Sequence, residues 1–146
     1  MAVPAGPVRA STDLERVMFD FVDAYNHAFE AAAREHSMSM AHACVLGRVG
    51  TRRGMGELAE ELGCDASNIT QIVTRLEGRS LVRREPNPED RRFRQIVRTP
   101  AGDVVNDAFE ESFDFPRRAV DGLTDEEQQQ LAALLHKALA AQRPTA

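Results

Sequence analysis

The chain has few cysteines, a single lysine and no long run of apolar residues. No segment approaches the roughly 20 consecutive apolar residues that a membrane-spanning helix requires. The first residues lack the charged start and apolar run of a secretory signal peptide, so we interpret residues 1–10 as a flexible arm. Two cysteines, Cys44 and Cys64, are too few for a disulfide scaffold, which favours a reduced cytosolic protein.

Sequence motifs of the common enzyme classes are also missing. The chain has no Gly-x-Ser-x-Gly elbow, phosphate-binding loop, Gly-x-Gly-x-x-Gly pattern or His-Glu-x-x-His zinc motif. The few histidines do not cluster with a nucleophile, and His36, His42 and Cys44 lack a recognisable metal-ligand spacing. We therefore expect no enzyme activity, no cofactor and no metal site.

The charge of the chain is unevenly distributed. The 146 residues carry a net charge of -5, and their number is typical of one domain. Residues 48–98 hold 11 arginines and 8 acidic residues, a net of +3, whereas the rest holds 7 basic and 15 acidic residues, a net of -8. A basic centre between acidic ends is typical of a local nucleic-acid site. A solvated charged face has the same composition, so charge alone leaves both readings open.

Helical spacing of apolar residues predicts a long helix that begins at Ser11 or Thr12 and ends near Glu35. Glu15 stands three residues after Thr12, which fits a capping box. A second helix is expected to start after Ser39, because its hydroxyl can accept from the free amides of the first turn.

Two further helices are predicted near the C-terminus. Thr99 is expected to cap the first of them, and Pro116 is expected to break or kink it. Thr124 and Glu127 form a capping box that opens the last helix, which carries a stripe of leucines.

Two short helices joined by a glycine-containing turn predict a helix-turn-helix in the centre of the chain. The first runs from Met55 to Gly63, which suits the position after a helix end. The second is capped by Asp65 and runs from Ala66 to about Glu77. Its apolar residues share one face. The opposite face carries Ser67, Asn68, Thr70, Gln71, Thr74 and Arg75.

The periodicity changes to that of strands after this helix. Leu81–Glu85 and Phe93–Arg98 can pair as strands, and the residues between them, Pro86–Asp90, are typical of a turn. A hairpin directly after a helix-turn-helix is a wing. The wing carries Arg83, Arg84, Arg91, Arg92, Arg94 and Arg98.

In order and spacing, these segments resemble the MarR (multiple antibiotic resistance regulator) family. The resemblance covers about Leu46–Gly102. It rests on Glu57–Gly63, Ile69–Glu77, Leu81–Arg84, Asp90–Arg92 and Thr99 with Gly102. The most specific part is Asp-Arg-Arg followed by the Thr-x-x-Gly. Three positions depart from the family pattern, which usually has glycine at Ser80, leucine at Arg98 and a serine or threonine cap at Gly54.

The resemblance implies a mainly α fold with a small β-hairpin wing. We expect a single domain over residues 11–146. Within it, residues 39–100 would form the winged helix-turn-helix lobe, and residues 11–36 and 101–142 would form dimerisation helices on either side.

The resemblance also implies that the polar face of the Ala66–Glu77 helix lies in a major groove. Asn68 and Gln71 can make bidentate contacts to adenine, and Arg75 can reach guanine or a phosphate. In the family the second arginine of Asp-Arg-Arg enters the minor groove, which is Arg92 here. The expected wing contacts are Arg84, Asp90, Arg91, Arg92 and Arg94. Asp90 would orient a neighbouring arginine, although an exposed ion pair of this kind can also be worth little.

The function implied is that of a homodimeric transcription factor, usually a repressor, in the cytoplasm of a bacterium or archaeon and at its nucleoid. It would bind a pseudo-palindromic double-stranded operator with half-sites about 10 bp apart. Family members often bind small aromatic or phenolic effectors. The residues placed for such a pocket are Tyr25, His27, Phe29, His42 and Cys44, each of which ordinary packing also explains. Two alternatives remain, a winged-helix module that binds proteins and a thiol-based oxidation sensor.

Overall fold

The computed structural model describes residues 9–143, so nearly all of the arm predicted at residues 1–10 lies outside the described residues. The chain divides into two compact units, Met1–Phe113 and Asp114–Ala146. Within residues 9–143, no helix is long and apolar enough to cross a membrane.

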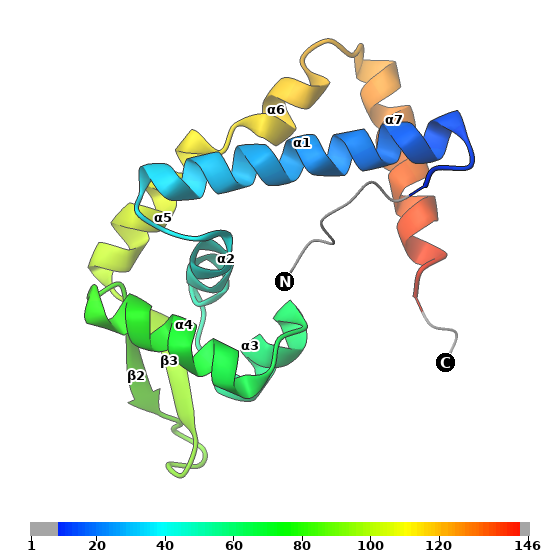
Figure 1. Ribbon diagram of the computed structural model, residues 1–146. Helices are drawn as coiled ribbons and strands as arrows, with labels where there is room; N and C mark the ends of the chain where they lie inside the picture. Colours follow the sequence, from blue (N-terminus) through cyan, green and yellow to red (C-terminus); the bar gives the residue numbers. More distant parts are fainter. Residues whose placement is uncertain (1–8, 144–146) are drawn as a thin grey trace. The chain divides into compact units, whose positions relative to one another are not determined.

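The fold is mostly helical with one small antiparallel sheet, as predicted (Figure 1). The elements of the first unit are α1 (Asp13–Glu35), α2 (Met40–Arg48), β1 (Arg53–Gly54), α3 (Met55–Leu62), α4 (Ala66–Gly78), β2 (Val82–Pro86), β3 (Arg94–Arg98) and α5 (Pro100–Ser112). The second unit holds α6 (Phe115–Val120) and α7 (Asp125–Ala140).

The helix starts follow the predicted caps. The side chains of Ser39, Asp65, Thr99 and Thr124 each accept a hydrogen bond from the backbone N–H three residues later. Thr12 does the same for α1, but the Glu15 carboxylate accepts from the backbone of Ser11 rather than from Thr12. The second hydrogen bond of the predicted capping box, from the backbone to the Glu15 carboxylate, is therefore donated by Ser11 instead of Thr12. 

Three features differ from the sequence prediction. The wing is part of a three-stranded sheet in the order β1-β3-β2, because Arg53 and Gly54 pair with Ile96 and Gln95. The fifth helix ends at Ser112, before Pro116, so the proline does not terminate it. A short extra helix, α6, begins at Phe115 with Pro116 in its first turn, where the missing proline N–H costs nothing.

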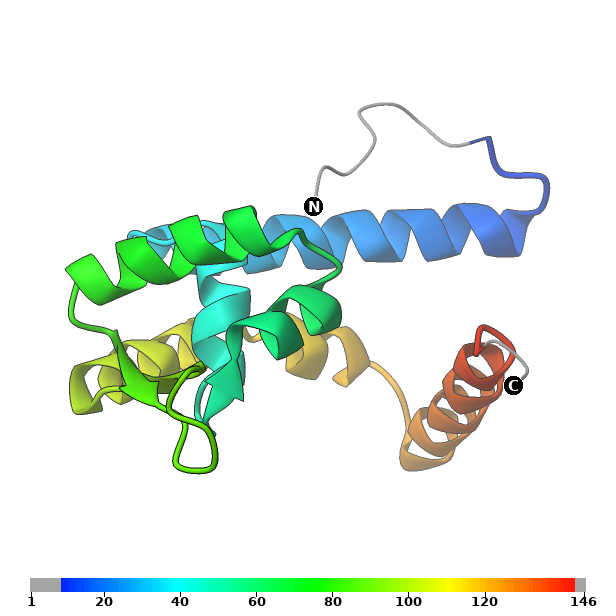
Figure 2. The same ribbon diagram turned by 90° about the horizontal axis from the view of Figure 1, so that it is seen from below.

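The core of the first unit lies around α2, which Figure 1 shows between α1, α4 and α5. Leu46 of α2, Leu58 of α3, Ile69 of α4 and Ile96 of β3 are fully buried in one apolar cluster. This cluster fixes α4 so that only its polar face remains exposed. The loop of the β2–β3 hairpin lies at the edge of the unit in both views (Figure 2).

The Thr99-x-x-Gly102 pattern holds the start of the wing against the first turn of α5. Thr99 donates its hydroxyl to the carbonyl of Ser80 at 2.6 Å and accepts from the N–H of Gly102 at 3.0 Å. A Cβ on Gly102 would overlap with the carbonyl oxygen of Leu81, so only glycine permits this approach. Ser80 has a φ of 59°, in the left-handed region, which accounts for the glycine that the family pattern usually has there.

Candidate nucleic-acid interface

The polar face of α4 has two kinds of side chain. Ser67, Thr70 and Thr74 are satisfied locally, because their hydroxyls donate to the Asp65 carboxylate and to the carbonyls of Ala66 and Thr70. Asn68, Gln71 and Arg75 are exposed, and their side chains make no hydrogen bond with other described residues. Only the second group presents unused donors to a ligand, whereas the hydroxyls of Ser67 and Thr70 keep acceptor capacity alone.

The wing is coupled to α4 by Arg84. Its guanidinium donates to the hydroxyl of Thr74 at 2.8 Å and lies 3.6 Å from the Glu77 carboxylate. Because Thr74 belongs to the exposed face of α4, this contact sets the first strand of the wing beside that face. Arg84 is thus held by the fold, and its charge is partly compensated.

Asp90 was expected to orient a neighbouring arginine, and the structure shows which one it is. Asp90 holds Arg92 itself. The carboxylate accepts from Arg92 Nη2 at 2.7 Å, from its Nε at 3.0 Å and from its backbone N–H at 3.1 Å. These hydrogen bonds hold the pKa of Asp90 below its usual value. The Arg92 side chain remains 86% exposed, so the pair orients the guanidinium without removing it from solvent.

The remaining wing arginines separate into outward and inward groups. Arg91 and Arg94 are exposed and form no ion pair within the described part of the chain. Arg83 pairs with Glu85 at 2.6 Å. Arg98 points inward: it donates to Asp103 at 2.8 Å and to the carbonyl of Leu46 at 3.2 Å.

The five residues proposed for an effector pocket do not come together in the first unit. Tyr25 and Phe29 belong to an aromatic cluster with Phe109 and Phe113, whose ring centroids lie 5.0–6.1 Å apart. His27 is exposed on α1 and contacts the carbonyl of Asp23. Packing therefore accounts for the two aromatic residues and leaves His27 separate.

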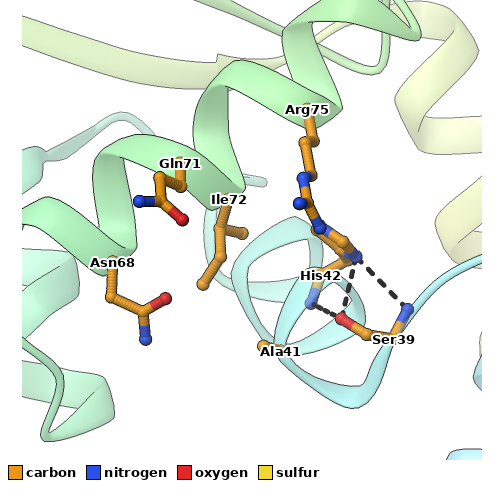
Figure 3. Close-up of a pocket in the computed structure, with 7 residues that line it drawn as sticks. All are labelled: Ser39, Ala41, His42, Asn68, Gln71, Ile72 and Arg75. Carbon is orange, nitrogen blue, oxygen red and sulfur yellow. Dashed lines mark hydrogen bonds between the residues drawn. The ribbon is translucent and has the colours of Figure 1, made fainter.

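His42 and Cys44 lie elsewhere again. His42 lines a cavity of about 150 Å³ between α2 and α4, together with Ser39, Ala41, Asn68, Gln71, Ile72 and Arg75 (Figure 3). Its Nδ1 lies 2.8 Å from the Ser39 hydroxyl, and its buried Nε2 has no hydrogen-bond partner in the described residues. Burial and the charges of Arg75 and Arg79 lower the pKa of His42.

Both cysteines are free and partly buried. At Cys44 the effect of burial on the thiol outweighs that of the nearby Arg48 charge. Burial raises the pKa of Cys44, which disfavours the thiolate that oxidation requires. Cys64 packs against the core and donates to the carbonyl of Leu62 at 3.4 Å.

Taken together, α3, the left-handed turn at Gly63, α4 and the following hairpin define a winged helix-turn-helix. Comparison with known proteins shows which family this part of the chain is similar to. The model of the MarR family matches residues 51–93, which confirms the resemblance seen in the sequence. Over these residues the chain is similar to the MarR family.

Solved structures show the same fold. YusO from Bacillus subtilis is 23% identical, with a TM-score of 0.70 over 90% of this chain and 94% of that one. Wild-type MarR from E. coli, in its apo form, is 22% identical, with a TM-score of 0.75 over 90% and 99% of the two chains. A mutant E. coli MarR complexed with operator DNA is 23% identical, with a TM-score of 0.70 over 86% and 93%. A search of curated proteins found no match.

Proposed function

We propose that this chain binds double-stranded DNA sequence-specifically through α4 and the β2–β3 wing. The observation that carries it is that Asn68, Gln71 and Arg75 share one face of α4 beside a wing with outward arginines. Their side chains make no hydrogen bond or ion pair with other described residues. Amide and guanidinium groups in this position are the side chains that read base edges in a major groove. The solved E. coli MarR complex with operator DNA is similar in fold, which supports the proposal.

The arginines of the wing would provide the electrostatic attraction to DNA. Arg92, held by Asp90 and 86% exposed, is the residue for the minor groove, where negative potential favours arginine. Arg91 and Arg94 would contact phosphates. Arg84 would act by positioning the wing against Thr74. The exposure of Arg92, and the lack of an acidic partner for Arg75 in the described residues, disfavour the protein-binding alternative.

We further propose that the protein acts as a homodimer, formed by helices within residues 11–36 and 101–142. Exposed apolar side chains on α1 and α7 support this. They include Leu14, Val17, Met18, Leu131, Leu134 and Leu139. Two copies of α4 related by a twofold axis would read a pseudo-palindromic operator with half-sites about 10 bp apart. The acidic helices would then lie away from the DNA, and the protein would act in the cytoplasm at the nucleoid.

Repression and its release by a small aromatic or phenolic effector complete the proposal. Release means that the effector binds the DNA-free conformation more tightly than the bound one. A simple phenolic carboxylate, titrated into the protein–DNA complex, should lower the bound fraction. If a panel of such compounds leaves DNA affinity unchanged, the effector part of the proposal is wrong while DNA binding stands.

The test of DNA binding is fluorescence anisotropy with the intergenic DNA next to the gene, measured over a range of salt. Affinity should fall steeply with salt, because each phosphate contact releases counterions. Arg92→Ala should weaken binding to all sequences, whereas Gln71→Ala should weaken it in a base-dependent manner. Arg143→Ala removes the same charge outside both the lobe and the proposed dimer helices, and it should change nothing. Failure of the wild-type protein to bind at low salt would overturn the proposal.

A further inference from the structure

One apolar side chain of the DNA-binding lobe is exposed without a role in the fold. Phe93 is 63% exposed. The other large apolar side chains that are exposed in residues 9–143 lie on α1, α5 and α7. No ring contact to Phe93 occurs among the described residues. Neither core packing nor the expected dimer helices therefore account for it.

The backbone holds Phe93 in a fixed place at the base of the wing loop. Its N–H donates to the carbonyl of Asp90 at 3.1 Å, and its carbonyl accepts from the N–H of Asn87 at 2.9 Å. Asp90 is also the residue that orients Arg92. Phe93 and Arg92 are thus consecutive residues of one turn, and Asp90 bonds to both, through its carbonyl to the Phe93 N–H and through its carboxylate to Arg92.

The charge around the ring indicates its partner. Arg91, Arg92 and Arg94 flank it, and of these only Arg92 has an acidic partner in the described part of the chain. An exposed apolar side chain between exposed arginines in the sequence fits a polyanion that also has apolar surface. A DNA minor groove has both, since phosphates line its rim and deoxyribose rings form its walls.

We propose that Phe93 is a DNA-contacting residue of the wing, and this inference rests on the proposed function. When Arg92 enters the minor groove, the ring of Phe93 packs against the deoxyribose wall and base edges beside it. Burial of the ring adds an apolar contribution to affinity next to the ionic one of Arg92. The two contributions differ in one measurable property, because only the ionic one depends on salt through counterion release.

The experiment compares Phe93→Ala, Phe93→Leu and Arg92→Ala with the wild-type protein on the same intergenic DNA, from 50 to about 300 mM salt. Phe93→Ala should lower affinity about tenfold at every salt concentration and leave the slope of log K against log salt unchanged. Phe93→Leu should recover most of the loss. Arg92→Ala should reduce the slope by about 0.9, the value for one phosphate-equivalent contact.

The outcomes separate this inference from the proposed function. If wild-type protein binds with a steep salt slope and Phe93→Ala binds equally well, the role of Phe93 is refuted and DNA binding stands. If wild-type protein does not bind, the proposed function itself fails. Because Phe93 is exposed, its variants should keep the wild-type Tm, which excludes loss of fold as the cause.

Two measurements test other partners for the ring. A shift of Phe93→Ala to a smaller species in sedimentation would assign the ring to contact between copies. Loss of binding to vesicles that contain anionic phosphatidylserine would assign it to a membrane surface. Either result, without a change in DNA affinity, overturns the inference.

Discussion

The helices α4 and α7 carry apolar residues with the same helical spacing, yet they bury them to opposite extents. Ile69 and Val73 of α4 are fully buried, whereas Leu134 and Leu139 of α7 are each 65% exposed. The first half of α1 resembles α7, with Leu14 70% exposed. Periodicity therefore predicts a helix and its apolar face, but not whether that face is covered by the same chain.

The sign of the net charge also differs between the parts of the chain with buried and with exposed apolar helix faces. The basic segment, residues 48–98, contains α3 and α4, whose apolar faces are buried, and Phe93 is the one large apolar side chain exposed among its described residues. The acidic flanks contain the helices with exposed apolar faces. The lobe is thus complete within one chain, while α1 and α7 have the surface that the proposed dimer requires.

Disrupting the contact between α5 and the residues that begin the wing should have the largest effect on stability. Gly102→Ala would place a methyl group against the carbonyl of Leu81, and the backbone of α5 and the wing would have to separate. We expect a loss of about 3 kcal/mol or more in the free energy of unfolding, measured by urea denaturation. Gly56→Ala is the matched control, since nothing lies within 4 Å of its added Cβ. It should stabilise the protein slightly through helix propensity. Equal effects of the two variants would contradict the steric explanation.

A charge on the exposed stripe of α7 tests the other side of the comparison. Leu134→Glu changes a side chain that is 65% exposed in the single chain. If a second copy covers it, the carboxylate must be desolvated, and dimer affinity should fall about 100-fold. Sedimentation equilibrium measures this directly. Gln129→Glu adds the same charge on the opposite side of the helix and should leave the oligomeric state unchanged. A wild-type protein that is monomeric would refute the dimer.

Arg98 and Arg92 allow buried and exposed charges to be compared within the lobe. Arg98 points inward, whereas Arg92 points outward. Arg98 is 16% exposed and bonded to Asp103 and to the Leu46 carbonyl. Arg98→Ala should cost about 2 kcal/mol in the free energy of unfolding and leave the salt slope of DNA binding unchanged. Arg92→Ala should leave the free energy of unfolding nearly unchanged and should reduce the salt slope of DNA binding. Thermal denaturation and anisotropy on the same preparations distinguish the two, and a changed slope for Arg98→Ala would show that its charge reaches the DNA.

The elements with a local chemical signature were predictable from the sequence. Side-chain caps such as Asp65 and Thr124 placed helix starts to within a residue, and Gly63 marked the end of α3. The strand β1 was missed because two residues have no periodicity, and they are extended only through pairing with β3. The helix α6 was missed because six residues are too few for a hydrophobic pattern.

The candidate site was predictable as a set of residues but not as a set of contacts. The exposed face of α4 followed from its periodicity. That Arg84 reaches Thr74 and that Arg98 points inward depend on strand register and side-chain direction. A sequence pattern contains neither. The exposure of Phe93 likewise depends on the conformation of the wing loop, which the sequence pattern does not contain.

The smallest expected effect concerns pH and His42, which lies beneath α4. Burial and the nearby charges of Arg75 and Arg79 lower its pKa below 6.5. The unfolded chain therefore binds a proton at this residue at a pH where the folded chain does not, so stability is lost as pH falls below about 6.5. Protonation would also remove the Nδ1 acceptor that completes the capping box with Ser39.

His42→Gln removes the titration and keeps a neutral acceptor at the third helical position, which a capping box accepts. Its free energy of unfolding should fall less than that of the wild type between pH 7.5 and pH 5, with the two converging above pH 7. His27→Gln on α1 is the control, because His27 is exposed and contacts only a carbonyl of its own helix among the described residues. It should follow the wild-type curve. If His42→Gln does so too, the cavity between α2 and α4 does not exclude the proton, and the lobe's acid sensitivity arises elsewhere.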